Sequence, residues 1–200
     1  MTSLAPARLV VFVSGNGSNL QAIIDACAEN RLPARVVAVF SNKSDAYGLE
    51  RARNAGIPAF VVPKPKELDR RAYDARLAGQ VAEFRPTWIV LAGWMRILTS
   101  AFLTQFPDRV INLHPALPGT FPGVGAIERA YQAYRQGAIP HTGVMVHLVP
   151  DEGVDSGPVL GEEIVPIDPA DTLEMLEKRV HTVEHRLLVD VLCRIIAYPI

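Results

Sequence analysis

Short runs of apolar residues alternate along the chain with segments whose apolar residues recur at helical spacing. The runs predict strands at Arg8–Val13, Val36–Phe40, Ala59–Val62, Trp88–Ala92 and Val110–Leu113. Helices are predicted over Ser18–Glu29, Ala46–Asn54, Asp69–Phe84, Thr99–Phe106 and Ala126–Gln136. Apolar runs without polar alternation are typical of parallel strands covered on both faces. The pattern therefore predicts an α/β protein with a doubly wound, mostly parallel sheet and helices on both faces.

The last third of the chain follows a different pattern. Gly143–Val149 and Val159–Ile167 are predicted to be two later strands, forming a hairpin at or near one edge of the sheet. From Leu173 to Val191, apolar residues recur at steps of three and four, which predicts a long C-terminal helix. The chain has 200 residues, of which 49% are hydrophobic, and it shows no internal repeat, so residues 1–200 are expected to form a single domain.

Charge and cysteine content exclude several classes of protein. Twenty basic and 21 acidic residues give a net charge of −1, without the runs of like charge expected for nucleic-acid or membrane partners. Cys27 and Cys193 form no CxxC pair, so neither a disulfide framework nor a structural zinc site is indicated. No apolar stretch is long enough for a signal peptide or a membrane span. We expect a soluble cytoplasmic protein that is a monomer or a homodimer.

The strand predicted at residues 110–113 runs into the most informative part of the chain. Asn112 and His114 alternate with Ile111 and Leu113, so both polar side chains project from one face of a strand that Pro115 should end. In open α/β sheets the carboxyl ends of the strands are where ligands bind, and histidine titrates near neutral pH. Asn112 and His114 are therefore candidate catalytic residues, although such residues can also satisfy local backbone groups. The loop Pro115–Gly125 that follows is rich in proline and glycine and is expected to border the site.

The first predicted strand runs directly into a glycine-rich turn, Ser14–Leu20. Glycines let the backbone approach a ligand closely, and free N–H groups at a helix start attract an anion. The third glycine of a dinucleotide fingerprint is replaced by Leu20, and no ribose-binding acid follows the next strand. The turn therefore favours a single phosphate over a dinucleotide; the alternative is a turn with no ligand.

A zinc-peptidase-like pattern lies near the end of the chain. His181, Glu184 and His185 match H-x-x-E-H, but only 15 residues follow to supply a further ligand. We therefore predict no metal site. His181 and Glu184 are instead candidates for facing a substrate from the helix.

Five segments together resemble the phosphoribosylglycinamide formyltransferases, a branch of the folate-dependent formyltransferase family. These segments are Ser14–Leu20, Phe40–Lys43, Leu91–Leu98, Asn112–Pro115 and Asp151–Pro158. The resemblance extends from about Arg8 to His185. It implies an enzyme of purine biosynthesis that transfers a formyl group from 10-formyltetrahydrofolate to the amine of N1-(5-phospho-D-ribosyl)glycinamide. The folate would be a co-substrate, and no tightly bound cofactor is implied.

The resemblance also assigns roles to individual residues. It makes Asn112, His114 and Asp155 the catalytic residues, with His147 as an auxiliary residue beside them. The residues implied for the nucleotide substrate are Gly17, Ser18, Asn19, His181 and Glu184. Those implied for the folate are Arg71, Met95, Arg96, Ile97, Leu98, Asn112, Pro150, Asp151 and Asp155.

Formyl transfer gives these residue types a chemical purpose. An amine attacks the formyl carbon, and the formyl oxygen becomes an oxyanion that hydrogen-bond donors can stabilise. The amide of Asn112 and a protonated His114 could both donate, and the Asp155 carboxylate is expected to raise the pKa of His114. Two alternatives stay open: a formyltetrahydrofolate hydrolase, which would not need the phosphate turn, and a non-catalytic nucleotide-binding domain of the same fold.

Overall fold

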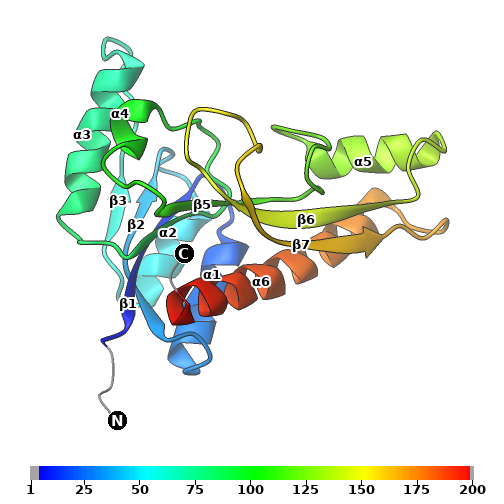
Figure 1. Ribbon diagram of the computed structural model, residues 1–200, viewed down its shortest axis with the longest axis horizontal. Helices are drawn as coiled ribbons and strands as arrows, with labels where there is room; N and C mark the ends of the chain where they lie inside the picture. The colour runs from blue at the N-terminus through cyan, green and yellow to red at the C-terminus, as the bar shows by residue number, and fades with distance from the viewer. Residues whose placement is uncertain (1–4, 199–200) are drawn as a thin grey trace.

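Seven strands form one sheet in the order β3-β2-β1-β4-β5-β6-β7 (Figure 1). The computed structural model describes residues 5–198. Its strands are β1 (Ala7–Val13), β2 (Ala34–Ser41), β3 (Ala59–Val61), β4 (Trp88–Leu91), β5 (Val110–His114), β6 (His141–Leu148) and β7 (Val159–Pro166). The first five are parallel, whereas β6 is antiparallel to β5 and β7 is antiparallel to β6. The mostly parallel sheet and its edge hairpin are therefore confirmed.

Within residues 5–198, six helices accompany the sheet. They are α1 (Ser18–Ala28), α2 (Tyr47–Asn54), α3 (Arg70–Ala82), α4 (Ser100–Leu103), α5 (Ala126–Arg135) and the long C-terminal helix α6 (Leu173–Ala197). The helix predicted over Thr99–Phe106 is wrong in length, because α4 is only one turn long. Beyond it, the N–H of Phe106 bonds to the carbonyl of Leu103, an i+3 contact. Pro107 follows, and a proline disfavours helical backbone at the residue before it.

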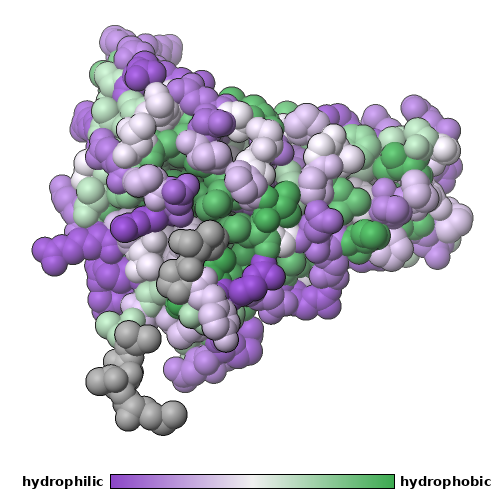
Figure 2. Space-filling view, viewed as in Figure 1, coloured by the Kyte–Doolittle hydropathy of each residue, from purple (hydrophilic) through white to green (hydrophobic). Residues whose placement is uncertain are grey.

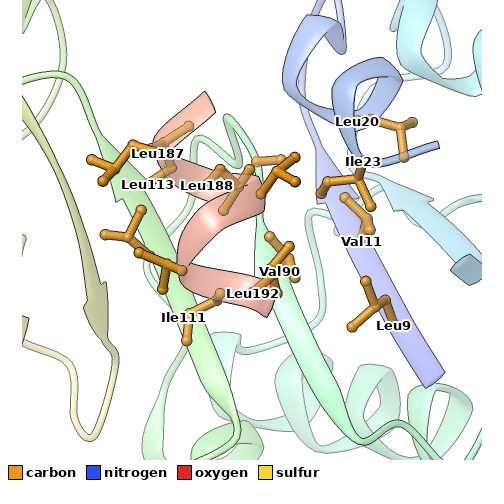
Figure 3. Close-up of a cluster of buried hydrophobic side chains, with 14 of the residues drawn as sticks. Leu9, Val11, Leu20, Ile23, Val90, Ile111, Leu113, Leu187, Leu188 and Leu192 are labelled. Atoms are coloured by element: carbon orange, nitrogen blue, oxygen red, sulfur yellow. The ribbon is translucent and has the colours of Figure 1, made fainter. Parts of the chain in front are cut away.

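Two apolar layers fill the space between the sheet and its helices. Figure 3 shows Leu188 of α6 near Leu113 of β5 and Leu192 of α6 near Ile111 of β5, all in one buried cluster that also includes residues of α1. The opposite face of the sheet is aromatic: the ring of Phe12 lies 5.5 Å from that of Phe40. Because side chains alternate along each strand, neighbouring residues of β1 supply the two layers. Helices cover both faces, as predicted.

The outer surface is mixed in polarity. On the face drawn in Figure 2, hydrophilic residues lie around the margins, and apolar residues gather near the centre, over the β5–β6–β7 part of the sheet. No helix within residues 5–198 is both long enough and apolar enough to cross a membrane. The 25-residue helix α6 includes charged residues and has its buried positions on one stripe.

The order of the strands brings the turn after β1 and the loop after β4 to the same edge of the sheet. From β1 the chain moves outward to β2 and β3, then returns to β4 on the other side of β1. Ligands bind at such switch points in open α/β sheets. The N–H of Ser14 donates to the carbonyl of Gly93 (3.0 Å), and the N–H of Met95 donates to Ser14 Oγ (2.9 Å). The glycine-rich turn after β1 therefore lies directly beside the loop after β4.

Candidate active site

Asn112 and His114 lie at the carboxyl end of β5, as the strand pattern predicted. Asn112 is half-buried, and His114 is only 3% exposed. Both share a strand face with Val110, which belongs to the layer packed under α3 and α4. The strand ends at His114, directly before Pro115. The two polar side chains are therefore fixed by a rigid strand rather than by a loop.

Asp155 reaches these residues from the connection between β6 and β7. Its Oδ1 accepts a hydrogen bond from Asn112 Nδ2 (2.9 Å), and its Oδ2 lies 3.2 Å from His114 Nδ1. The N–H of Gly123 also donates to Oδ2 (2.8 Å). Asp155 has a φ of +49°, a left-handed conformation uncommon for a residue with a Cβ. The structure thus brings together the three residues for which the resemblance implies catalysis, and the carboxylate joins them to the Pro115–Gly125 loop.

His147 completes this cluster from β6, where it pairs with Asn112 across the two strands. Its Nδ1 lies 2.7 Å from the carbonyl oxygen of Leu148, so this nitrogen carries a proton. In the neutral ring Nε2 is then an acceptor, 3.1 Å from Asn112 Nδ2. The two N–H groups of Asn112 are therefore shared between His147 and Asp155. Donation from Asn112 to an oxyanion requires one of these hydrogen bonds to be released.

The pKa of His114 differs from the prediction. Burial lowers this pKa below its ordinary value, and the nearby Asp155 carboxylate, which favours the imidazolium, offsets the effect only in part. The predicted increase is therefore wrong in its net direction, although the effect of Asp155 has the expected sign. The presence of the carboxylate could be inferred from the sequence, whereas the extent of burial depends on packing. Burial therefore favours the neutral imidazole in the resting protein.

Asp155 keeps its charge. Burial alone would raise the pKa of Asp155, but the neighbouring His147, the hydrogen bond from the Gly123 N–H and the neighbouring His114 hold it below its ordinary value. A neutral imidazole beside an ionised carboxylate suits a base that takes up a proton during a reaction, because the carboxylate stabilises the resulting imidazolium.

The Pro115–Gly125 loop closes over His114, which the sequence predicted only in outline. The carbonyl oxygen of Phe121 lies 3.1 Å from His114 Nε2. Arg129, at the start of α5, holds this segment because its Nη2 donates to the carbonyls of Phe121 and Pro122, both at 2.7 Å. Sequence reasoning did not find Arg129, because its partners are backbone oxygens that any residue could supply.

The glycine-rich turn after β1 has the features of an anion site. Gly17 precedes α1 with a φ of +75°, and no side chain among residues 5–198 caps the N–H groups of the first helical turn. Those groups are available to an anion. A Cβ on Gly17 would lie only 2.6 Å from the Cα of Gly48 in α2. Gly17 is therefore needed for the shape of the turn itself.

Helix α6 adds a charged pair beside this turn. Glu184 is only 5% exposed. Its Oε2 accepts a hydrogen bond from Asn19 Nδ2 (3.4 Å) and lies 2.6 Å from His181 Nδ1. The hydrogen bond to Glu184 raises the pKa of His181 above its ordinary value. Asn19, Glu184 and His181 are thus in contact, and the buried Oδ1 of Asn19 has no partner within the described chain.

The structure also bears on the zinc-peptidase pattern. The buried Nε2 of His185 has no hydrogen-bond partner among the described residues. Between residues 5 and 198, no group of three or more His, Cys, Asp or Glu side chains is placed to hold a metal ion.

The residues implied for the folate lie mainly in the loop after β4. Met95 is 60% exposed and Ile97 is 41% exposed, which leaves apolar side chains uncovered beside the carboxyl end of the sheet. Arg96 lies over the ring of Tyr73 (5.2 Å). Leu98 differs from its neighbours because its side chain is buried in the core. Only the backbone of Leu98 could therefore meet a ligand.

The remaining folate candidates lie on either side of this loop. Arg71 Nη1 donates to Ser100 Oγ (3.1 Å), beside the loop after β4. Pro150 and Asp151 are exposed at the start of the β6–β7 connection, where Asp151 Oδ1 accepts from the N–H of Gly153 (2.8 Å). Apart from Arg71 on α3 and Asn112 on β5, the implied residues thus lie on two loops, those after β4 and after β6.

Comparison with known proteins points to one family. Residues 7–192 match the family described as formyl transferase. The phosphoribosylglycinamide formyltransferase of Schizosaccharomyces pombe is 48% identical, with 95% of this chain and 97% of that protein covered. The Escherichia coli protein of the same name is 45% identical, with 90% and 82% covered. The crystal structure of glycinamide ribonucleotide transformylase 1 from Symbiobacterium toebii superposes with a TM-score of 0.87 at 41% identity, covering 94% of this chain and 87% of that one.

Proposed function

The chain belongs to the formyl transferase family, and we propose that it transfers a formyl group from 10-formyltetrahydrofolate to the amine of N1-(5-phospho-D-ribosyl)glycinamide. One observation carries the proposal: Asn112, His114 and Asp155 meet at the sheet edge where an uncapped phosphate turn and an exposed apolar loop also lie. That edge offers one site for an anionic nucleotide, the formyl acceptor, and another for a flat folate, the formyl donor. Both sites border the cluster of titratable groups.

The acceptor nucleotide fits the turn and helix α6. Its phosphate would accept hydrogen bonds from the free N–H groups of the first turn of α1, including those of Ser18 and Asn19. A protonated His181 adds a positive charge nearby. Glu184, held by His181 and Asn19, is then placed to accept hydrogen bonds from the sugar hydroxyls or the amine. This arrangement supports a phosphorylated substrate.

The folate fits the two loops that follow β4 and β6. Met95 and Ile97 present apolar surface on the first loop, and Asp155 lies on the second. A flat pterin ring is suited to such a site, in which most of the lining is apolar and a few polar groups fix the orientation. Arg71 and Arg96 lie on the same side and could pair with the carboxylates of the glutamate tail.

The proposed reaction uses the protonation states described above. The neutral amine attacks the formyl carbon, a C–N bond forms, and the formyl oxygen becomes an oxyanion. The amine loses a proton, which neutral His114 can accept as the ionised Asp155 stabilises the imidazolium. The His114 imidazolium then donates a hydrogen bond to the oxyanion. It returns its proton to N10 of the folate as the bond from N10 to the formyl carbon breaks.

The loop after β5 must move away from His114 during this cycle. His114 Nε2 faces the carbonyl of Phe121, so that oxygen occupies the position through which Nε2 would act on substrate. Binding of both substrates would exchange this contact for one with the reacting groups. The cluster supports catalysis after a local movement of residues 115–125.

A turnover assay with one substrate omitted tests the proposal against its alternatives. Loss of the formyl group from 10-formyltetrahydrofolate is followed with and without the nucleotide. The proposal requires turnover only when the nucleotide is present. Turnover without it would indicate the hydrolase, and none in either case would indicate the non-catalytic nucleotide-binding domain. Organisation as one domain, the cytoplasmic location and the choice between monomer and homodimer stay predictions.

A further inference from the structure

The connection between β6 and β7, which carries Asp155, has few anchors. At its base the N–H of Leu148 donates to the carbonyl of Pro158, and the N–H of Val149 donates to the carbonyl of Val110, both at 2.9 Å. Asp155 holds its middle through the contacts described above. The third anchor is Glu152, an exposed residue whose Oε1 accepts a hydrogen bond from the N–H of Ser100 (2.9 Å). Of these anchors, Glu152 alone reaches across to the loop after β4.

The partner of Glu152 is the first turn of α4. The adjacent N–H, that of Thr99, donates to the buried Asp74 Oδ2 (2.7 Å), which fixes the helix start against α3. Arg71 also bonds to Ser100 Oγ, so a positive charge lies close to the Glu152 carboxylate. Asp74 thus holds the end of the Met95–Leu98 loop against the core, and Glu152 ties the Asp155 loop to the same point.

We propose that Glu152 is a positioning residue for the folate, because it sets the spacing between the two loops that would enclose this substrate. We call the hydrogen bond between the Ser100 N–H and Glu152 Oε1 the bridge. Both loops also carry exposed apolar side chains: Val154 is 44% exposed, and Met95 is 60% exposed. The inference rests on the proposed function, since it concerns the same donor.

The local backbone makes this coupling tight. Only Gly153 and Val154 separate Glu152 from Asp155. The Gly153 N–H is bonded to Asp151 Oδ1, and a Cβ on Gly153 would lie only 2.5 Å from Ser156 Oγ. A turn this closely packed moves as a unit. Release of Glu152 would therefore displace the backbone that carries Asp155, and with it one wall of the folate site.

Five substitutions separate the Glu152–Ser100 bridge from an incidental surface contact. Glu152→Ala removes the acceptor, whereas Glu152→Gln keeps an oxygen that can accept from the Ser100 N–H. Ser100→Pro removes the donor at the first helical position, where proline is tolerated, and the residue before it already has an extended backbone. Ser100→Ala controls for loss of the hydroxyl. Glu83→Ala is the matched control, because Glu83 is exposed and makes no side-chain hydrogen bond among the described residues.

The test measures KM for 10-formyltetrahydrofolate at saturating nucleotide and, independently of turnover, the Kd for tetrahydrofolate. Loss of one exposed hydrogen bond should raise both by about threefold to tenfold in Glu152→Ala. Glu152→Gln and Glu83→Ala should stay near wild type, and nucleotide affinity should not change. Ser100→Pro should raise KM and Kd over the Ser100→Ala values by the same factor. The double variant Ser100→Pro/Glu152→Ala should have the same KM and Kd as Ser100→Pro alone.

Distinct results would overturn the bridge and the proposed function. Wild-type folate affinity in Glu152→Ala would refute the positioning role of the bridge. So would a double variant in which the increases caused by Glu152→Ala and Ser100→Pro multiply. A wild-type protein that binds tetrahydrofolate without transferring the formyl group would refute the proposed function, and the Kd values would still judge the bridge. A wild-type protein that does not bind tetrahydrofolate would refute both.

Discussion

Replacing Asp155 with asparagine removes a negative charge from the centre of the candidate site while keeping the size of the side chain. In the resting protein the carboxylate accepts hydrogen bonds from Asn112 Nδ2 and the Gly123 N–H, and it lies 3.2 Å from His114 Nδ1. An asparagine carries one acceptor oxygen and one donor amide. It can therefore satisfy only one of these two donors and must turn its own NH2 group toward the other.

The size of the effect follows from these contacts. A hydrogen bond to a charged group contributes about 1.5–3 kcal/mol; the variant loses one of the two donors and the charged contact with the His114 imidazolium, which together amount to about 3–6 kcal/mol. At about 1.36 kcal/mol per factor of ten, the rate of formyl transfer should fall by about 10²- to 10⁴-fold if the transition state uses both contacts. The melting temperature at neutral pH should fall too, which has to be measured on the same protein.

The pH dependence tests the role of Asp155 more specifically than the rate. The charge of Asp155 favours the imidazolium, so its removal should lower the pKa of His114 further. Because the proposed base is neutral His114, the acidic limb of kcat/KM against pH reports its pKa, and this limb should move to lower pH in Asp155→Asn. NMR titration of the His114 imidazole provides the direct measurement.

Two results would refute this reasoning. An unchanged or higher pKa of His114 in Asp155→Asn would show that the carboxylate does not act on the imidazole. Movement of the alkaline limb to lower pH, with the acidic limb fixed, would show that His114 acts from its charged form. A stability control is available, because the pKa of Asp155 is lowered by folding. Ionised Asp155 therefore stabilises the fold at pH values above its unfolded pKa of about 4, and this stabilisation is lost as the pH falls through the folded pKa. The free energy of unfolding of Asp155→Asn should not show this decrease at acidic pH.

Two further predictions concern the surroundings of the cluster. The raised pKa of His181 keeps a positive charge beside the phosphate turn, so nucleotide affinity measured by calorimetry should weaken as the pH rises through that pKa. His181→Gln should bind more weakly at low pH and lose this dependence; an identical pH profile would contradict the assignment. Arg129→Ala removes both hydrogen bonds to the carbonyls of Phe121 and Pro122, so limited proteolysis should cut residues 115–125 faster at unchanged global stability. Cutting at the wild-type rate would show that Arg129 does not hold the loop.

Local patterns in the sequence were sufficient to predict most of the fold. The boundaries of the strands and of the longer helices depend on periodicity, capping and apolar runs, which are properties of neighbouring residues. The same reasoning places Asn112 and His114, because a period of two fixes the face they share. The short α4 is the exception, because the effect of Pro107 on the preceding turn outweighed an apolar pattern that was compatible with helix.

The interactions that organise the site could not be predicted in this way. Asp155 is distant from His114 in the chain, and only the resemblance to known formyltransferases connected the two. The contacts of Phe121 and Gly123 use backbone groups, which leave no signature in the sequence. The pKa of His114 depends on how completely the folded chain excludes water, and in this case burial outweighed the nearby charge.

Direct observation of the transferred group tests the central claim most sharply. The protein is given 10-formyltetrahydrofolate with a carbon-13 label in the formyl group, together with N1-(5-phospho-D-ribosyl)glycinamide, and the label is followed by NMR. The proposed function predicts that the label moves to the amine of the nucleotide with the wild-type protein, and about 10²- to 10³-fold more slowly with folded His114→Ala. Label released as formate, or transfer at the wild-type rate by His114→Ala, would contradict it.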